Sequence, residues 1–295
     1  MADSHAEDAE LPTNWGRWGT GDDRGTLNFI TDQARARGVA EATSGQVVSL
    51  AMPITPVPLG GGFGFPAGQP MPAPVTQIMN FTGTPAAAFT DMLVINVHHL
   101  KSTHIDALVH VNAGGHVYPG IAVNEAIAGG TVRKSSSAPF TTGVTTRGVL
   151  LDLAPGSSLT DSYQVTGADF EQAEKRSGVR VESGDALVVR GGWNVSENPL
   201  GPTPYMTLDA VKWMAAREVS LYAGDLCDEP PIRPGSLVMH QVALARLGMP
   251  LIDGAEVDEL ARTCQELGRY SFLFVLGTIP VTGATGLPAN PLAIF

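Results

Sequence analysis

The most informative segment of this 295-residue chain reads Thr103-His104-Ile105-Asp106-Ala107-Leu108-Val109-His110. Histidines crowd around it, because five of the seven in the chain fall within residues 98–116. These five are His98, His99, His104, His110 and His116. Histidine is the commonest metal ligand and a frequent acid/base side chain. The clustering therefore indicates a site of chemistry in this part of the chain.

His104 and Asp106 form the first candidate pair. Alternate side chains of an extended strand share a face, and two residues span about 6.6 Å along it, so both side chains can reach one ion. Imidazole nitrogen with carboxylate oxygen suits zinc, manganese or iron(II). An ordinary hydrogen-bonded pair is the alternative. The surrounding histidines favour metal or acid/base use of His104, Asp106 and His110.

One strand cannot supply a complete ligand set, so further ligands must come from elsewhere. His240 is the one distant histidine outside the N-terminal tail, and Asp253 follows it across the turn Gly248-Met249-Pro250. Taken alone, His240 is as consistent with a core residue as with a ligand.

His98 is the third candidate ligand from the histidine-rich segment. An extended strand would place it on the same side as His104, but about 20 Å away at about 3.3 Å per residue. It can join His104 only if the chain bends around Lys101-Ser102, by a bulge or turn. The alternative is a supporting or core role for His98. His99 and His116 are expected to be ordinary core histidines bonded to backbone carbonyls.

Strand and helix patterns alternate through the second half of the chain, which predicts an α/β fold. Residues 1–13 form a polar tail, and no linker divides residues 14–295, so a single domain is expected. Helices are expected at 31–44 (with Asp32 as N-cap), 167–177, 207–217, 237–247 and 255–268. Strands are expected at 47–50, 91–98, 148–152, 186–190, 219–223 and 271–277.

Residues 53–74 are too rich in proline and glycine to hold a regular element. Phe63 and Phe65 would make this loop an apolar flap over a substrate pocket, with a surface loop as the alternative. Trp18 lies in a segment with two tryptophans that is expected to dock on the core, and contact with a ligand is its second interpretation. Phe63, Phe65 and Trp18 are therefore the candidate substrate contacts.

Composition and motifs exclude several classes of function. The chain has 18 Lys and Arg against 29 Asp and Glu, a net charge of −11 without a basic cluster. This argues against a nucleic-acid partner and against a polybasic membrane-surface protein. No apolar run is long enough to cross a membrane. The acidic N-terminus lacks signal-peptide features, and two cysteines make no disulfide framework. We expect a cytoplasmic protein with a small-molecule substrate.

Thr103–His110 resembles the His-x-Gly-Thr-His-x-Asp-Ala-Pro-x-His signature of the metal-dependent cyclase superfamily, which includes bacterial kynurenine formamidase and isatin hydrolase. The segment Gly184–Trp193 resembles a central strand of that family, and Gly283–Leu292 resembles its closing Gly-x-Pro-x-Asn-Pro segment. The opening, Asn14–Gly19, resembles a longer-chain branch. The resemblance covers residues 14–295.

The resemblance implies a swivelling β/β/α fold with a mixed β-sheet core and flanking helices, assembled as a homodimer or homotetramer. It implies one or two divalent ions, zinc or manganese, and hydrolysis of an amide, lactam or lactone bond in a small apolar or aromatic substrate. Carried over by motif, His104 and Asp106 are metal ligands, with Asp106 bridging two ions if both are present. His110 is the general acid/base, and His240 with Asp253 holds the second ion.

The chain departs from the family pattern at four positions. Leu100 stands where the signature has its first histidine, which His98 would replace. Ser102 stands for the glycine, Leu108 for the proline, and Asp253 for a glutamate. Two other functions therefore stay open. One is a cyclase that closes a ring on a polyketide-like substrate, with or without metal. The other is a small-molecule binding protein that kept the fold without catalysis.

Overall fold

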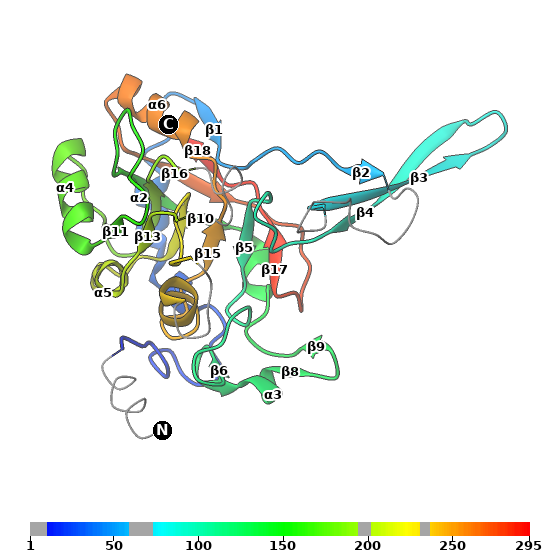
Figure 1. Ribbon diagram of the computed structural model, residues 1–295, viewed down its shortest axis with the longest axis horizontal. Coiled ribbons are helices and arrows are strands. Elements are labelled where there is room, and N and C mark those ends of the chain that lie inside the picture. The colour runs from blue at the N-terminus through cyan, green and yellow to red at the C-terminus, as the bar shows by residue number, and fades with distance from the viewer. Residues whose placement is uncertain (1–10, 59–72, 194–201, 231–236) are drawn as a thin grey trace.

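The computed structural model describes residues 11–58, 73–193, 202–230 and 237–295. Within these ranges, nine strands form one mixed sheet in the order β1-β18-β16-β10-β12-β14-β15-β5-β17 (Figure 1). In that order their bounds are Val47–Ser49, Leu292–Ile294, Ser271–Leu276, Val144–Asp152, Ala186–Arg190, Leu221–Gly224, Leu251–Asp253, His104–Asp106 and Gly286–Pro288.

The centre of the sheet is parallel and its flanks are antiparallel. Strands β10, β12, β14 and β15 run in one direction, whereas β16 and β5 run against their neighbours. The central strands are almost continuously apolar, as expected for parallel strands covered on both faces. This arrangement confirms the α/β class and the mixed sheet with flanking helices.

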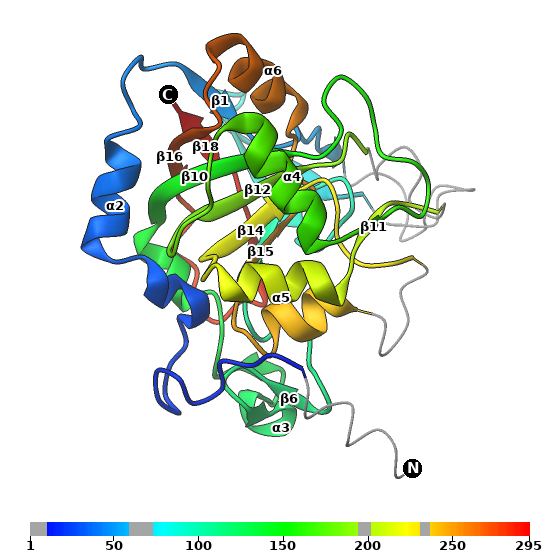
Figure 2. The same ribbon diagram turned by 90° about the vertical axis from the view of Figure 1, so that its left-hand side faces the viewer.

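Alternate residues of the central strands enter two different cores. Leu151 and Val189 pack into the core under helices α4 (Gly167–Ser177) and α5 (Leu208–Ala216), which cover one face of the sheet (Figure 2). Leu150 and Val188 point the other way, into a core that also holds Leu260 and Cys264 of α6 (Asp258–Leu267). The two-residue period of a strand thus fills both cores from one sequence.

The predicted elements agree with the structure in the second half of the chain. Strands β10, β12, β14 and β16 and helices α4, α5 and α6 lie where periodicity placed them, and the expected helix at 237–247 is a π-helix, η3 (Val238–Leu244). Two predictions were wrong in part. Helix α2 spans only Asp32–Val39, and its N-cap is Thr31, whose hydroxyl accepts a hydrogen bond from the amide of Ala34.

Strand β4 also differs from its prediction. It spans Ala88–Ile95 and ends before His98. It pairs with β3 (Val75–Thr82), which pairs with β2 (Val57–Pro58), in a separate three-stranded sheet that projects from the body (Figure 1). The remaining short elements are η1 (Gly25–Phe29), β6 (His116–Val117), β7 (Ile121–Ala122), α3 (Val123–Ala126), β8 (Ile127–Ala128), β9 (Thr131–Val132), η2 (Ala138–Thr142), β11 (Gln164–Val165) and β13 (Tyr205–Met206). Among the described residues, no helix combines the length and apolarity needed to span a membrane.

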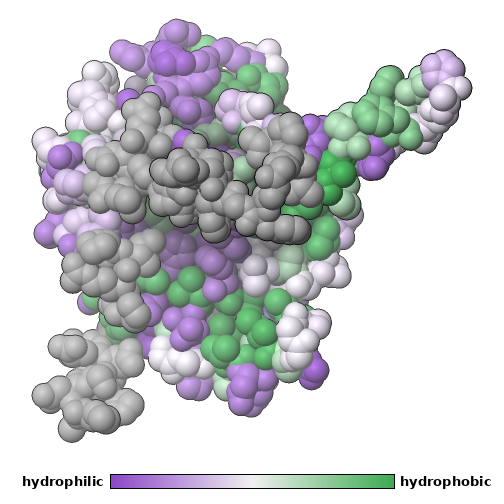
Figure 3. Space-filling view, turned by 45° about the vertical axis from the view of Figure 1, so that its right-hand side comes forward, coloured by the Kyte–Doolittle hydropathy of each residue, from purple (hydrophilic) through white to green (hydrophobic). Residues whose placement is uncertain are grey.

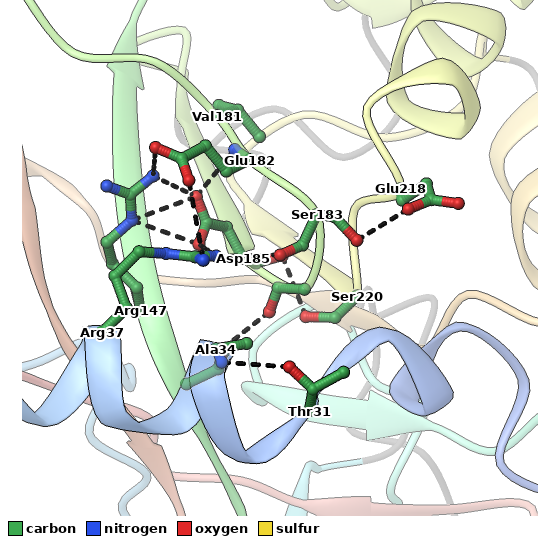
Figure 4. Close-up of polar contacts among 12 residues, drawn as sticks. Thr31, Ala34, Arg37, Arg147, Val181, Glu182, Ser183, Asp185, Glu218 and Ser220 are labelled. Atoms are coloured by element: carbon green, nitrogen blue, oxygen red, sulfur yellow. Dashed lines mark hydrogen bonds and ion pairs between the residues drawn. The ribbon is translucent and has the colours of Figure 1, made fainter.

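A buried ion-pair network joins α2 to the centre of the sheet (Figure 4). The carboxylate of Asp185, in the turn before β12, is fully buried. It accepts hydrogen bonds from Arg147 of β10 at 2.6 Å and from Arg37 of α2 at 2.9 Å. The backbone amide of Glu182 donates a further bond at 2.8 Å. Asp185 therefore fixes the helix and two strands to one another.

Candidate metal centre

Strand β5 carries His104 and Asp106 into the sheet between β15 and β17. Its pairing with β15 places Asp253 directly opposite His104, so the side chains of these two residues share a face. Asp106 lies two residues along β5 and therefore points to the same side. The sheet thus brings three of the predicted site residues together from two parts of the sequence.

His98 reaches this face because the chain reverses between His98 and His104. The amide of Ser102 donates to the carbonyl of His99 at 2.9 Å, which closes a turn before β5 begins. The Nδ1 atom of His98 lies 2.9 Å from Oδ1 of Asp106. The bend predicted around Lys101-Ser102 is confirmed, whereas one extended strand through residues 98–106 was wrong.

Thr285 and Gly286, at the start of β17, hold the His98 ring in position. Thr285 places its hydroxyl 3.0 Å from Nε2 of His98, which leaves Nδ1 facing Asp106. Gly286 supplies room, because a Cβ atom there would lie 2.7 Å from Cε1 of His98. On its other side His98 stacks on His110, with ring centroids 3.6 Å apart.

His240 approaches Asp106 from the opposite side, on the π-helix η3. Its Nε2 atom lies 3.3 Å from Oδ2 of Asp106 and 3.4 Å from Oδ2 of Asp253. Its Nδ1 atom lies 2.5 Å from Oδ2 of Asp228, which orients the ring. π-Helical turns are frequent at functional sites because they re-aim a side chain within a helix.

The carboxylate of Asp106 is the centre of the cluster. It is fully buried, and neither of its oxygens has a hydrogen-bond partner among the described residues, although imidazoles lie within 2.9–3.6 Å. Burial raises the pKa of this carboxyl group. The neighbouring imidazoles, His240 and His98 foremost, together lower it by more, so its pKa lies well below the ordinary value. A buried carboxylate requires a compensating positive charge, which protonated imidazoles or a metal ion would supply.

The residues present fit divalent metal ions. Oδ1 of Asp106 faces His98 and His104, at 2.9 and 3.6 Å, while Oδ2 faces His240 at 3.3 Å. Ligands bound to one ion at about 2.0–2.2 Å lie about this far from one another. Imidazole nitrogen and carboxylate oxygen are donors that zinc and manganese both accept. Two groups of candidate ligands therefore share Asp106.

His110 lies beside both groups. Asp106, His110 and His240 each offer a ligand atom, and these atoms lie within 4.8 Å of one another. Burial lowers the pKa of His110 to about 4, although the charge of Asp106 acts in the opposite direction. Its imidazole is therefore neutral near pH 7 and able to accept a proton.

Residues 48–228 match the model of the Cyclase family, described as "Putative cyclase". The chain belongs to this family. The match spans more than half of the sequence and confirms the resemblance seen in the motif. The family match and the hydrolase neighbours support an enzyme that, at the level of the family, is a hydrolase or a cyclase.

Solved structures agree with the family assignment. A crystal structure described as a novel cyclase is 28% identical to this cyclase-family chain, with a TM-score of 0.82 over 97% of this chain and 98% of that one. Isatin hydrolase A from Ralstonia solanacearum is 17% identical, with a TM-score of 0.56 over 88% and 95% of the two chains. An isatin hydrolase bound to the product analogue thioisatinate is 14% identical, with a TM-score of 0.59 over 90% and 99%. At this identity the isatin hydrolases show a shared fold. No curated protein matches the chain.

Sequence reasoning missed three polar residues of the cluster. Asp228 and Thr285 orient His240 and His98, and Cys227 places Sγ 3.5 Å from Oδ1 of Asp253. A signal for Cys227 and Asp228 was present, because they lie three and four residues after the end of the buried strand β14. The carboxyl ends of β14 and β15 meet at one edge of the sheet, where α/β proteins place their sites.

Some of the remaining predicted residues lie away from the cluster in this cyclase-family protein. Trp18 packs edge-on against Phe29, with centroids 5.0 Å apart, and its described contacts do not include the histidine cluster. Phe63 and Phe65 lie outside the described residues. His99 is buried, as expected. His116 is exposed beside Trp15, so a core position for it was wrong, because the β6–β7 hairpin that carries it lies at the surface.

Proposed function

We propose that this chain is a metal-dependent hydrolase that cleaves an amide, lactam or lactone bond in a small apolar or aromatic substrate. The observation that carries the proposal is the buried Asp106 carboxylate, whose two oxygens face two separate sets of donor atoms. Hydrolysis is supported by the fold that the chain shares with isatin hydrolases.

The first ligand group would be His98, His104 and Oδ1 of Asp106, and the second would be Oδ2 of Asp106, His240 and Asp253. When bound, a divalent zinc or manganese ion supplies a Lewis acid that polarises a carbonyl group and makes water more acidic. Asp228 keeps Nε2 of His240 turned toward the carboxylates.

His110 would move the proton. Because its imidazole is neutral near pH 7, it can accept a proton from the attacking water. It then returns that proton to the leaving nitrogen or oxygen. Its stacking against His98 fixes the plane of the ring beside Asp106. This role requires His110 to remain free of the ions, which distinguishes it from the other histidines of the cluster.

We propose an apolar or aromatic substrate for two reasons. Charged residues make up only 16% of the chain. The isatin hydrolases, which share the fold, are named for the hydrolysis of isatin, and one was solved bound to the product analogue thioisatinate. Aromatic lactams, formamides and lactones are therefore the first compounds to assay.

Ring closure is the second candidate function. It is favoured by the family match and by the 28% identical structure described as a cyclase. In this case His110 would remove a proton from a carbon next to a carbonyl of a polyketide-like chain, with or without a metal ion. That carbon would attack a second carbonyl of the same chain to close the ring, and His110 would return the proton to the oxygen of that carbonyl. Oxygen from water would not enter the product.

Isotope labelling separates the two functions. The protein, supplied with zinc or manganese, is incubated in ¹⁸O-water with isatin, an aromatic formamide and an aromatic lactone. Hydrolysis places one ¹⁸O in the product carboxylate, and His110→Gln should lower kcat by about 10²–10⁴-fold. His116→Gln is the matched control, because His116 is exposed and outside the cluster. Turnover that is equal in wild type and His110→Gln would contradict the assigned role. Ring closure of a linear polyketide mimic without ¹⁸O uptake would favour the second candidate.

A further inference from the structure

The thiol of Cys227 lies beside the second group of candidate ligands, although the proposed function gives it no part. Its Sγ atom is 3.5 and 3.8 Å from the two carboxylate oxygens of Asp253 and 3.7 Å from Nδ1 of His240. Cys227, His240 and Asp253 each offer a ligand atom, and these atoms lie within 4.8 Å of one another. Atoms bound to one tetrahedral zinc ion at about 2.0–2.3 Å lie about 3.3–3.8 Å apart. The thiol is therefore placed as a ligand would be.

The turn that carries Cys227 is fixed on both sides of the thiol. The carbonyl oxygen of Cys227 accepts a hydrogen bond from the amide of Met206 in β13 at 2.9 Å. The next residue, Asp228, accepts one from the amide of Met239 at 2.6 Å and holds Nδ1 of His240 at 2.5 Å. One short turn thus positions the thiol and orients the imidazole beside it, which is the preorganisation that a ligand set needs.

The second cysteine of the chain shows an ordinary packing role for comparison. Cys264 of α6 is fully buried among apolar side chains. Cys227 is only partly buried, and its sulfur faces a carboxylate and an imidazole. A thiol is a weak hydrogen-bond donor, so hydrogen bonding to these groups gains little from a cysteine. Metal binding is the property of a cysteine that these neighbours would use.

Metal-binding side chains gather at one place in the described part of the chain. All three groups of side chains that could hold an ion there belong to the histidine cluster, and Cys264 lies outside them. The projecting β3–β4 arm presents mainly apolar side chains instead (Figure 3), and Asp91 is the only charged residue within 75–95. A metal–thiolate bond in this protein would therefore form at Cys227.

We propose that Cys227 is a ligand of the second ion, together with Asp106, His240 and Asp253, and that it makes this site selective for zinc over manganese. The proposal rests on the two ligand groups of the proposed function. When the bond between sulfur and the metal ion forms, the S–H bond breaks and its proton passes to solvent. No oxidant or reductant takes part.

A thiolate changes the metal preference of a site. Soft thiolate ligands select zinc, whereas manganese suits carboxylate, carbonyl and water ligands. The first group, made of His98, His104 and Oδ1 of Asp106, contains no sulfur. The second site should therefore discriminate between zinc and manganese more strongly than the first. Manganese would still fill the second site when zinc is absent.

The number of ligands then separates the two sites. Four protein ligands complete the tetrahedral shell of a structural zinc site, whereas three leave a coordination position open, as catalytic sites require. With Cys227 the second site is closed, and it would hold Oδ2 of Asp106 in place. The first group keeps an open position for the substrate. His110, the proposed proton carrier, stacks on His98 of this first group with ring centroids 3.6 Å apart.

Cobalt(II) spectroscopy of the full chain tests the proposal. Cobalt(II) can replace zinc in sites with these ligands. A bound thiolate adds a sulfur-to-metal charge-transfer band in the near ultraviolet, which nitrogen and oxygen ligands do not give. Wild-type protein loaded with cobalt(II) should show this band. Cys227→Ser should abolish the band while the visible cobalt bands remain, and the matched control Cys264→Ala should keep it.

Metal affinities give a second measurement, made by competition with a chelator. In Cys227→Ser the affinity of the second site for zinc should fall by more than the 10–100-fold that is typical of a residue that only orients a ligand, about the loss expected of a lost ligand. The affinity for manganese should change much less, because manganese gains little from a thiolate. A merely structural role of Cys227 would lower both affinities alike.

The outcomes separate this proposal from the proposed function. Cobalt-loaded wild type without the charge-transfer band would overturn the assignment of Cys227 alone, and so would a band that persists in Cys227→Ser or disappears in folded Cys264→Ala. Protein that binds no divalent ion would overturn both proposals.

Circular dichroism checks that the two variants fold. If either does not, X-ray absorption at the zinc edge of the wild type decides. A sulfur shell at about 2.3 Å is expected. A shell of nitrogen and oxygen alone would contradict the proposal.

Discussion

Nδ1 of His98 lies 2.9 Å from Oδ1 of Asp106, so the two atoms face each other at the centre of the cluster. Here Thr285 fixes the ring of His98, and the sheet fixes Asp106. The geometry is that of two atoms directed at a common third one, which is how ligands of a metal ion are arranged.

His98 is therefore expected to be a full ligand in place of the histidine missing at Leu100. His98→Ala should lower metal affinity as much as His104→Ala does, and by more than the 10–100-fold typical of residues that only orient a ligand. Isothermal titration with zinc measures both. Near-wild-type affinity in His98→Ala would remove it from the ligand set.

Gly286 should be required for the position of His98. In Gly286→Ala the new Cβ would lie 2.7 Å from Cε1 of His98 and 2.8 Å from the carbonyl oxygen of Ile105, so the ring must move. We expect zinc affinity to fall about 10–100-fold, as when a supporting residue is lost. Gly277→Ala is the control, because no heavy atom lies within 4 Å of its added Cβ. Equal affinity in the two variants would show that the ring has room to adjust.

His240 should belong to the second ion alone. His240→Ala is expected to lower the metal content from two ions to one per chain, as measured by mass spectrometry of the purified protein. Asp228→Asn should leave the stoichiometry at two ions per chain but lower the affinity for the second ion about 10–100-fold, since Asp228 only orients the ring of His240. If His240→Ala does not change the metal content, His240 is a core or substrate-contacting residue and not a ligand.

Asp185 should be the most sensitive polar position for stability away from the cluster. Asp185→Ala leaves the buried guanidinium group of Arg147 and the partly buried one of Arg37 without their shared carboxylate. Removing one partner of a buried ion pair costs about 3–5 kcal/mol, and urea denaturation would measure the loss. Glu266→Ala, on the exposed side of α6, is the control and should leave the midpoint unchanged. A midpoint equally unchanged in Asp185→Ala would show that the network does not stabilise the fold.

The local sequence pattern was sufficient to predict the central sheet. Strands such as β12 and β14 are short apolar runs between turn signals. When such runs alternate with helices, a parallel sheet is the expected arrangement. His104 and Asp106 could be placed on one face for the same reason, since the period of a strand is two. These inferences needed only neighbours along the chain.

What local pattern could not supply was the way distant segments meet. The reversal that brings His98 to Asp106 depends on Thr285 and Gly286, which lie about 190 residues away. Strand β4 was expected as a strand, but nothing in its apolar residues distinguishes a buried strand from an exposed arm. Asp228 was missed because its link to His240 passes through the sheet edge and the π-helix rather than through a motif.

The central claim is that Asp106 would hold two divalent ions, one at each carboxylate oxygen. The most direct measurement is anomalous diffraction from crystals grown with manganese. The account predicts two peaks, one beside Oδ1 of Asp106 with His98 and His104, and one beside Oδ2 with His240 and Asp253. Both should disappear in Asp106→Asn while the fold is retained. Peaks that do not touch Asp106, or peaks that persist in Asp106→Asn, would contradict the account.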